Sequence, residues 1–478
     1  MPTELDISPT SSVQSPPRRP ITSRDPRSGE TWRTWEHPDE ATVRRRAADA
    51  RIAQAGWAAT PLGERLACIR RFRAALFERR DEVAALIERE VGKSRSDALA
   101  ADVIVTLDLA AYYLRISRKV LRSRRETGAS LAMLRKQIEI RRDPYGVVAV
   151  ISPWNYPLML AAGVIIPALI AGNAVILKPS EFSTATAELL VELLVGAGVP
   201  RDACQCLPGD GVTGATLIDA GVDKVFFTGS VRGGRAVAAA CGERMIPVNL
   251  ELGGNDAAIV LSDADVVATA RGLLWGRFFT AGQTCVAPKR VLVEAGVYET
   301  LVAALKAEML ILTSGAGDGS HVGPVVRPEQ AQTLSGQLED AVRGGATVAA
   351  MVAQGATAQG DSWNPPALVI DVPRDARLMH EEAFGPLLAL VRVRNVDDAV
   401  ALANSSDFGL SASIWTRNEA SRRQHCHQAA GWHRAGERCG GERRHPESPA
   451  RRPEGQRRGS LPWSGGAAGV YTDADDRA

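Results

Sequence analysis

The chain has 478 residues, 45% of them apolar, and its 57 Lys and Arg side chains are almost balanced by 55 Asp and Glu, which gives a net charge of +2. The length and apolar content predict about three domains with cores of their own. The balanced charge gives no indication of a nucleic-acid partner or an anionic membrane, so a small neutral or acidic ligand fits better.

Two features concern the cellular environment. No apolar run approaches the roughly 18 residues of a membrane span, and the N-terminus has no hydrophobic signal core. The seven cysteines are an odd number without the regular spacing of a disulfide framework. We therefore expect a cytoplasmic protein with reduced thiols and no membrane partner.

The first part of the chain divides into an arm and a helical region. Residues 1–28 mix Ser, Pro and Arg without apolar periodicity, which predicts a disordered arm. From about Asp39 to Arg124, apolar residues recur at intervals of three and four. This spacing predicts successive amphipathic helices that pack against a sheet.

From Gln137 onward, short apolar strands alternate with plausible helices. The strand candidates are QIEIRRDPYGVVAVISP, AGNAVILKPS and DKVFFTGS, and a second series near Leu250 offers NDAAIVL, KRVLVEA and LLALVRV. Near-continuous apolar strands that alternate with helices are typical of parallel, doubly wound sheets. We therefore predict an α/β fold with two tandem doubly wound domains, preceded by helices.

Two strand ends are candidate ligand sites. In FFTGSVRGGR the strand ends at Thr228-Gly229-Ser230, where a helix N-terminus could hold a phosphate, although a tight turn explains these glycines equally well. In VILKPSEFS, Lys178 and Glu181 lie at the edge where doubly wound sheets bind ligands. A solvated lysine and a first-turn glutamate are the alternative interpretation.

Three further residues are candidates for catalysis. Asn155 follows Trp154 in the loop ISPWNYP, where its amide could donate to an oxyanion or simply form a turn. Glu251 stands in the apolar stretch VNLELGGND, and burial there would raise its pKa and suit a general base. Cys285, in FFTAGQTCVAPKR, is either a nucleophile or a small buried apolar residue.

Taken together, these stretches resemble the aldehyde dehydrogenase superfamily. PWNYP, KPSE, FTGS, LELGG, GQTC and EEAFGP occur in the family's order, and the match runs from about residue 40 to about 420. WGRFFTAGQTCVAP is similar to the class-3-like branch, which oxidises aliphatic and aromatic aldehydes. The resemblance implies a helical and Rossmann-like NAD-binding region over residues 29–250 and a catalytic domain over residues 251–420.

The resemblance also implies a mechanism and a cofactor site. Cys285 would attack the aldehyde, Asn155 and the Cys285 N–H would hold the oxyanion, and Glu251 would activate water to hydrolyse the thioester. NAD is the expected cofactor, with NADP possible, because Glu181 would repel a 2′-phosphate. The residues matched to cofactor contacts are Trp154, Lys178, Glu181, Gly229, Ser230, Glu382 and Phe384.

After Arg417 the resemblance stops. The family continues with a helix, an R-L-x-A-G-x-V-x-V-N strand and a P-F-G-G-x-K-x-S-G segment. This chain instead has eleven arginines and no lysine from residue 421 onward, which predicts an aberrant, disordered tail over residues 421–478. Its histidines and cysteines match no standard zinc spacing, so no metal site is expected.

A reading frame shifted by one base accounts for this tail. Read one base later, the codons from Gln428 to Arg438 permit R-L-x-A-G-T-V-x-V-N, and those from Pro449 permit P-x-G-G-x-K-G-S-G. We interpret the tail as the product of an insertion or deletion near codons 418–424. The family implies a homo-oligomer, and this tail makes that oligomer doubtful because it lacks the strand used in subunit pairing.

Two other functions remain as alternatives. The frameshift could leave an inactive dinucleotide-binding relic, or the arginine-rich tail could bind RNA or a metal. The main prediction is an NAD(P)-dependent aldehyde dehydrogenase that acts on a small-molecule aldehyde and has no nucleic-acid partner.

Overall fold

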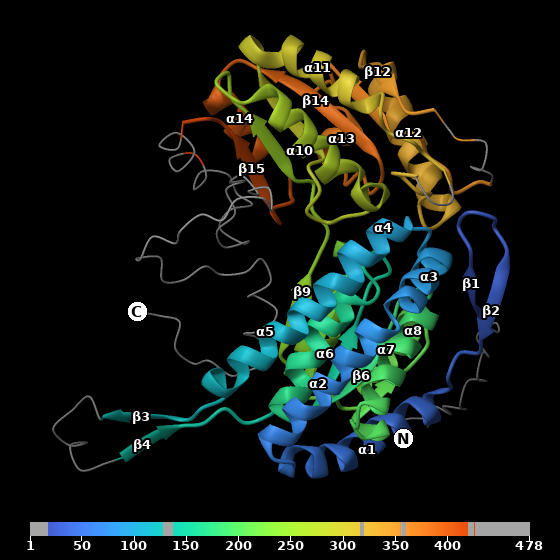
Figure 1. Cartoon of the computed structure of the whole chain (residues 1–478), viewed down its shortest axis with the longest axis vertical. Helices are drawn as coiled ribbons and strands as arrows, with labels where there is room; N and C mark the ends of the chain where they lie inside the picture. Colours follow the sequence, from blue (N-terminus) through green and yellow to red (C-terminus); the bar gives the residue numbers. More distant parts are fainter. Residues whose placement is uncertain are drawn as a thin grey trace, which may run out of the picture.

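The computed structural model describes residues 18–127, 137–315, 320–353, 355, 360–418 and 425. These residues form two α/β bodies, one above the other in Figure 1, each built around its own sheet. The predicted fold class of two tandem α/β domains preceded by helices is confirmed. The predicted aberrant tail lies outside the described residues, apart from His425.

The first body contains a five-stranded parallel sheet in the order β7-β6-β5-β8-β9. Every residue of β5 and β6 is buried, as expected for strands that helices cover on both faces. The strands are β5 (Val147–Ile151), β6 (Ala174–Lys178), β7 (Cys204–Cys206), β8 (Lys224–Thr228) and β9 (Val248–Glu251).

Helices from both the N-terminal region and the strand connections cover this sheet. Helix α2 packs against α5, α6 and α7, and one apolar core joins these helices to the strands. The N-terminal helices are α1 (Glu40–Ala59), α2 (Leu62–Glu78), α3 (Arg80–Val91), α4 (Arg95–Asp97), the π-helix η1 (Ala98–Val103) and α5 (Ile104–Val120). The connecting helices are α6 (Met159–Ala171), α7 (Thr184–Gly196), the 3₁₀ turn η3 (Arg201–Ala203), α8 (Gly211–Asp219) and α9 (Val231–Glu243).

The second body contains a six-stranded sheet in the order β12-β13-β14-β11-β10-β15, in which only β12 runs antiparallel to its neighbour. Its strands are β10 (Ala257–Val260), β11 (Arg290–Glu294), β12 (Thr347–Met351), β13 (Ala367–Ile370), β14 (Leu387–Val393) and β15 (Ala412–Trp415). Its helices are α10 (Val266–Phe278), the 3₁₀ turn η4 (Phe279–Gly282), α11 (Ala295–Met309), α12 (Pro328–Arg343), α13 (Arg377–His380) and α14 (Val396–Ala403).

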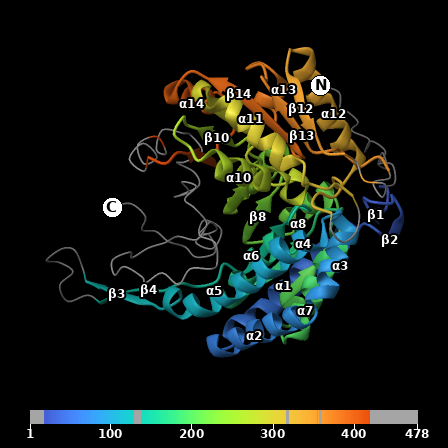
Figure 2. The ribbon, with the colours of Figure 1, turned by 45° about the horizontal axis from the view of Figure 1, so that its top comes forward.

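Two antiparallel hairpins complete the fold. β3 (Arg124–Thr127) and β4 (Gln137–Ile140) form a ribbon that projects from the first body in Figures 1 and 2. β1 (Ile21–Arg24) pairs with β2 (Thr31–Trp35), and the buried Ser23 hydroxyl donates to Glu90 at 3.3 Å. The prediction of a disordered arm over residues 1–28 is therefore wrong for residues 21–24, because this segment pairs with β2 as a strand.

Among the described helices, none combines the length and apolar character that a membrane crossing requires. The two sheets separate between Glu251, the last residue of β9, and Ala257, the first residue of β10. The loops that carry the predicted catalytic residues lie at this junction.

Candidate active site

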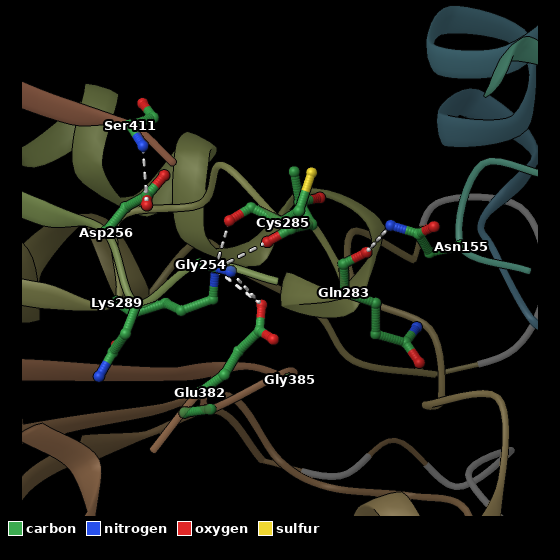
Figure 3. A network of polar contacts seen from close by, with 12 residues as sticks. Asn155, Gly254, Asp256, Gln283, Cys285, Lys289, Glu382, Gly385 and Ser411 are labelled. Carbon is green, nitrogen blue, oxygen red and sulfur yellow. Dashed lines mark hydrogen bonds and ion pairs between the residues drawn. The ribbon is translucent and has the colours of Figure 1, made fainter. Parts of the chain in front are cut away.

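Three loops from distant parts of the chain meet between the two bodies. The Asn155 side chain, after β5, donates through Nδ2 to the backbone oxygen of Gln283 at 3.0 Å (Figure 3). A Cβ atom on Gly254, which follows β9, would lie 3.1 Å from the carbonyl oxygen of Cys285. The structure therefore brings the Asn155 loop and the chain after Glu251 beside the Cys285 loop.

The backbone before Cys285 has an unusual conformation. Thr280 and Ala281 have φ angles of 52° and 53°, in the left-handed region that a β-branched residue rarely occupies. Gly282 follows with φ of 70°, and a Cβ there would collide with the carbonyl of Gly385. The Asp97 carboxylate accepts from the Thr280 N–H at 2.9 Å, so a helix of the first body holds this strained turn.

A hydroxyl cluster supports the same loop from behind. The Tyr156 hydroxyl lies 2.6 Å from the Thr284 hydroxyl and 3.3 Å from that of Thr280. Burial raises the pKa of Tyr156, so the phenol stays protonated and its hydroxyl can serve as a donor. The residue that follows Asn155 is thus tied to the residue that precedes Cys285.

A buried ion pair supports the Asn155 loop. Lys93 Nζ lies 2.6 Å from the Asp102 carboxylate and 3.8 Å from the centre of the Tyr156 ring. Asp102 also accepts from the backbone N–H groups of Leu158 and Met159, both at 3.2 Å. These contacts satisfy the otherwise free donors at the start of α6.

The surroundings of Cys285 influence the ionisation of its thiol. Cys285 is only partly exposed, and burial raises the pKa of its thiol to about 11. The Lys289 ammonium lowers this pKa. An N–H from Val286 further favours the thiolate. The surroundings therefore provide two groups that stabilise the negatively charged sulfur.

The structure corrects the prediction that Glu251 is buried. Glu251 is exposed at the end of β9, because this strand is at the edge of the sheet and its other residues are only partly buried. The surrounding protein still desolvates the carboxylate enough to raise its pKa above the ordinary value. Its position gives it access to water, which a general base for hydrolysis requires.

Buried cations lie beneath the Cys285 loop. Arg277 is fully buried and donates to the carbonyl oxygens of Ala383 and Leu387, each at 2.6 Å, and to that of Gly385. Lys289 is buried 3.5 Å from the Glu382 carboxylate. Burial lowers the pKa of both cations, to about 9 for Arg277.

The predicted cofactor residues fall into two groups. Lys178 ends β6 and Glu181 follows it, with their charged groups 4.0 Å apart. Ser230 caps α9 by accepting from the Gly233 N–H at 3.1 Å. Glu382 accepts from the Gly254 N–H at 3.1 Å. At the junction of the bodies, the rings of Trp154 and Phe384 meet edge to face, 5.5 Å apart.

Sequence reasoning missed several residues that support this site. Lys289, Arg277 and Asp97 were not singled out, because charged residues next to apolar stretches are usually solvated. The sequence Pro-Lys directly before strand β11, which begins at Arg290, was the one available signal for Lys289.

The sequence of this chain is similar to those of known proteins. The sequence model of the aldehyde dehydrogenase family matches residues 13–437. The 4,4'-diapolycopene aldehyde oxidase of Methylomonas sp is 37% identical over 378 residues, which are 79% of this chain and 70% of that protein. The betaine aldehyde dehydrogenase 2 of Rhizobium meliloti is 34% identical over 401 residues, 83% of this chain and 82% of that protein.

Solved structures show the same fold. The NADP-dependent glyceraldehyde-3-phosphate dehydrogenase from Bacillus halodurans, complexed with NADP, is 34% identical and superposes with a TM-score of 0.81 over 86% of each chain. The fold and the comparisons define an oxidoreductase that acts on aldehydes and uses NAD(P). This chain belongs to the aldehyde dehydrogenase family.

Proposed function

We propose that Cys285 is the nucleophile of this aldehyde dehydrogenase, that Asn155 and the Cys285 N–H hold the oxyanion, and that Glu251 is the general base. The observation that carries this assignment is the hydrogen bond from Asn155 to Gln283, two residues before Cys285. An amide nitrogen has two N–H groups, so one can anchor the loop while the other donates to an oxyanion.

The residues support a covalent mechanism. The Cys285 thiolate attacks the aldehyde carbon, and the carbonyl oxygen becomes an oxyanion that the two N–H donors stabilise. A nicotinamide cofactor, held by the residues named below, would supply the oxidation as the acceptor of the hydride from this carbon. Glu251 then takes a proton from water, which hydrolyses the thioester to the carboxylic acid and restores the thiol.

The residues around α9 and β6 suit a dinucleotide. The first N–H groups of α9, beside Gly229 and the exposed Ser230, face outward from a helix N-terminus, which favours a pyrophosphate. Lys178 and Glu181 are placed for a ribose, and Trp154, Glu382 and Phe384 for the nicotinamide end. The Glu181 carboxylate, 39% exposed, favours NAD over NADP because it would repel a 2′-phosphate.

An apolar aldehyde is the proposed substrate class, as in the class-3-like branch. Trp275 is 53% exposed and stacks on Phe279 with ring centres 5.1 Å apart. Phe279 packs against an apolar cluster that includes Tyr156, Met159 and Leu160. Since Tyr156 also bonds Thr284, this buried apolar cluster connects the exposed Trp275 and its partner Phe279 with the loop of the proposed nucleophile. The relative named 4,4'-diapolycopene aldehyde oxidase has a name that fits an apolar aldehyde.

The C-terminal region and the location of the protein are also proposals. The family's expected C-terminal motifs are absent after Arg417, although the family model matches as far as residue 437. We propose that the chain beyond about residue 420 is translated out of frame, which would weaken oligomer formation in the cytoplasm. Sequencing the gene across codons 410–478 tests this, because the frame one base later should encode the two family motifs, and a shifted frame without these motifs would contradict the proposal.

The test of the proposed function is covalent capture. With an apolar aldehyde and NAD, the wild-type protein should release acid, while Glu251→Gln should accumulate an acyl group on the peptide that contains Cys285, detected by intact-mass and peptide mass spectrometry. Cys285→Ala should lose both the acyl group and turnover. Full turnover by folded Cys285→Ala would exclude the proposed nucleophile.

A further inference from the structure

Lys289 has a position that neither the mechanism nor the fold explains by itself. Its side chain is buried, and Nζ donates to the carbonyl oxygens of Thr284 at 3.0 Å and of Cys285 at 2.7 Å (Figure 3). The third neighbour is the Glu382 carboxylate at 3.5 Å. An ammonium has three N–H donors, so two of them serve the carbonyls, while the carboxylate compensates the charge as an ion pair.

The two carbonyls determine where the neighbouring N–H groups point. In a planar trans peptide, the C=O and the N–H of one unit point in opposite directions. The Thr284 carbonyl shares its unit with the Cys285 N–H, and the Cys285 carbonyl shares its unit with the Val286 N–H. Because both carbonyls are turned toward Lys289, both N–H groups point to the opposite side of the loop.

The thiol lies on that opposite side. The Val286 N–H interacts with the Cys285 sulfur, as expected from this orientation. Two successive N–H groups that face one point form a site for an anion. In a poorly solvated site, a positive charge against the carbonyl oxygens also polarises the peptide units and strengthens their N–H groups as donors.

We infer that Lys289 is a positioning residue, which aims and polarises the backbone N–H groups that stabilise the oxyanion at Cys285. This inference rests on the proposed role of Cys285 as the nucleophile. Lys289 itself does not touch the reacting atoms, since it acts through the two peptide units from the far side of the loop.

Stabilisation of the turn after Cys285 does not by itself require a lysine at position 289. The Ala287 N–H already donates to the Thr284 carbonyl at 3.2 Å, and the Lys289 backbone N–H is anchored on the Asp256 carbonyl at 3.0 Å. Neither bond needs the ammonium, whereas burying a charge costs several kcal/mol before its partners compensate. A methionine would fill the space of the lysine stem without its charge.

The experiment compares Lys289→Met with Lys306→Met, which removes an exposed lysine on α11. The readout is the hydrolysis of p-nitrophenyl acetate without cofactor, because this ester needs the thiol and an oxyanion site but no NAD. We expect Lys289→Met to lower its kcat about 10²- to 10³-fold, as for the loss of an oxyanion donor, with little change in KM. Lys306→Met should match the wild type.

A second variant distinguishes the charge from the packing. Lys289→Ala leaves room for a small alkylammonium ion, so adding ethylammonium should restore part of the ester hydrolysis, whereas neutral ethanol should not. The pH profile of Cys285 alkylation should shift to higher pH in Lys289→Met. Glu382, Asp256 and Arg277 also face Lys289 and are unchanged in both variants.

The outcomes separate the inference from the proposed function. Wild-type ester hydrolysis by folded Lys289→Met would overturn the role of Lys289, and so would a failure of ethylammonium to restore any activity to Lys289→Ala. If Cys285→Ala itself kept full activity, the proposed nucleophile would be wrong as well.

Discussion

The two sheets hold their functional residues in different ways. In the five-stranded sheet, polar groups stand at the ends of strands or just after them, and their partners are nearby in sequence. Lys178 pairs with Glu181, and Ser230 accepts from the Gly233 N–H. In the body of the six-stranded sheet, Arg277 on helix α10 is buried, and the carbonyls it binds belong to a segment more than 100 residues further along the chain. Local contacts shape the proposed adenosine and pyrophosphate end of the cofactor site, whereas long-range contacts shape the proposed nicotinamide end and the loop of the proposed nucleophile.

The comparison is tested most strongly at Arg277. Arg277→Met should lower the free energy of unfolding by about 3–5 kcal/mol, because three buried carbonyls lose their donor. Urea denaturation measures this change. Arg271→Met, on the same helix but with a side chain 67% exposed, should change the value by less than about 1 kcal/mol. Equal effects of the two substitutions would contradict the claim that buried long-range contacts hold this end.

Asn155 lies in the first body and contacts the second, and its substitution should give the next largest effect. Asn155→Ala should reduce kcat for aldehyde oxidation about 10²- to 10³-fold, or about 3–4 kcal/mol, because an oxyanion donor and the bond to Gln283 are both lost. Cofactor affinity, measured by fluorescence titration, should stay close to that of the wild type. A variant with normal kcat and weak cofactor binding would indicate that Asn155 contacts the cofactor and not the oxyanion.

Ser230 should show how small a local effect is. Ser230→Ala removes the cap of α9 and should cost about 1 kcal/mol, while Ser230→Gly should cost only a few tenths. Cofactor affinity should fall several-fold in the alanine variant, and hydrolysis of an activated ester should not change. Loss of ester hydrolysis would show that α9 and the nucleophile loop are coupled more closely than these contacts indicate.

The sequence predicts those parts of the molecule that depend on local patterns. The apolar runs at 147–151 and 174–178 are strands, and they are apolar throughout because helices cover both faces of the sheet. Asn155 and the Cys285 loop meet, as the family resemblance implies. The local sequence does not reveal whether a strand lies at the edge of its sheet. The prediction that Glu251 is buried was therefore wrong, since Glu251 ends the edge strand β9 and is exposed. Pairing with β2 likewise orders a segment whose composition predicted disorder.

Buried charges are the residues that sequence reasoning found hardest. Nothing near Arg277 or Lys289 in the chain reveals that their partners are backbone carbonyls, because any residue type supplies a carbonyl. Such sites become visible only after the loops have been placed in space.

The hydrogen bond between Asn155 and Gln283, together with the contact of Trp154 with Phe384, has a consequence during synthesis of the chain. The thiol is on one body and its proposed side-chain oxyanion donor on the other, so neither half holds the whole proposed site. On the proposed roles, a newly made chain forms thioesters efficiently only after both halves have folded and docked. Thioester formation on partly folded copies should therefore be slow.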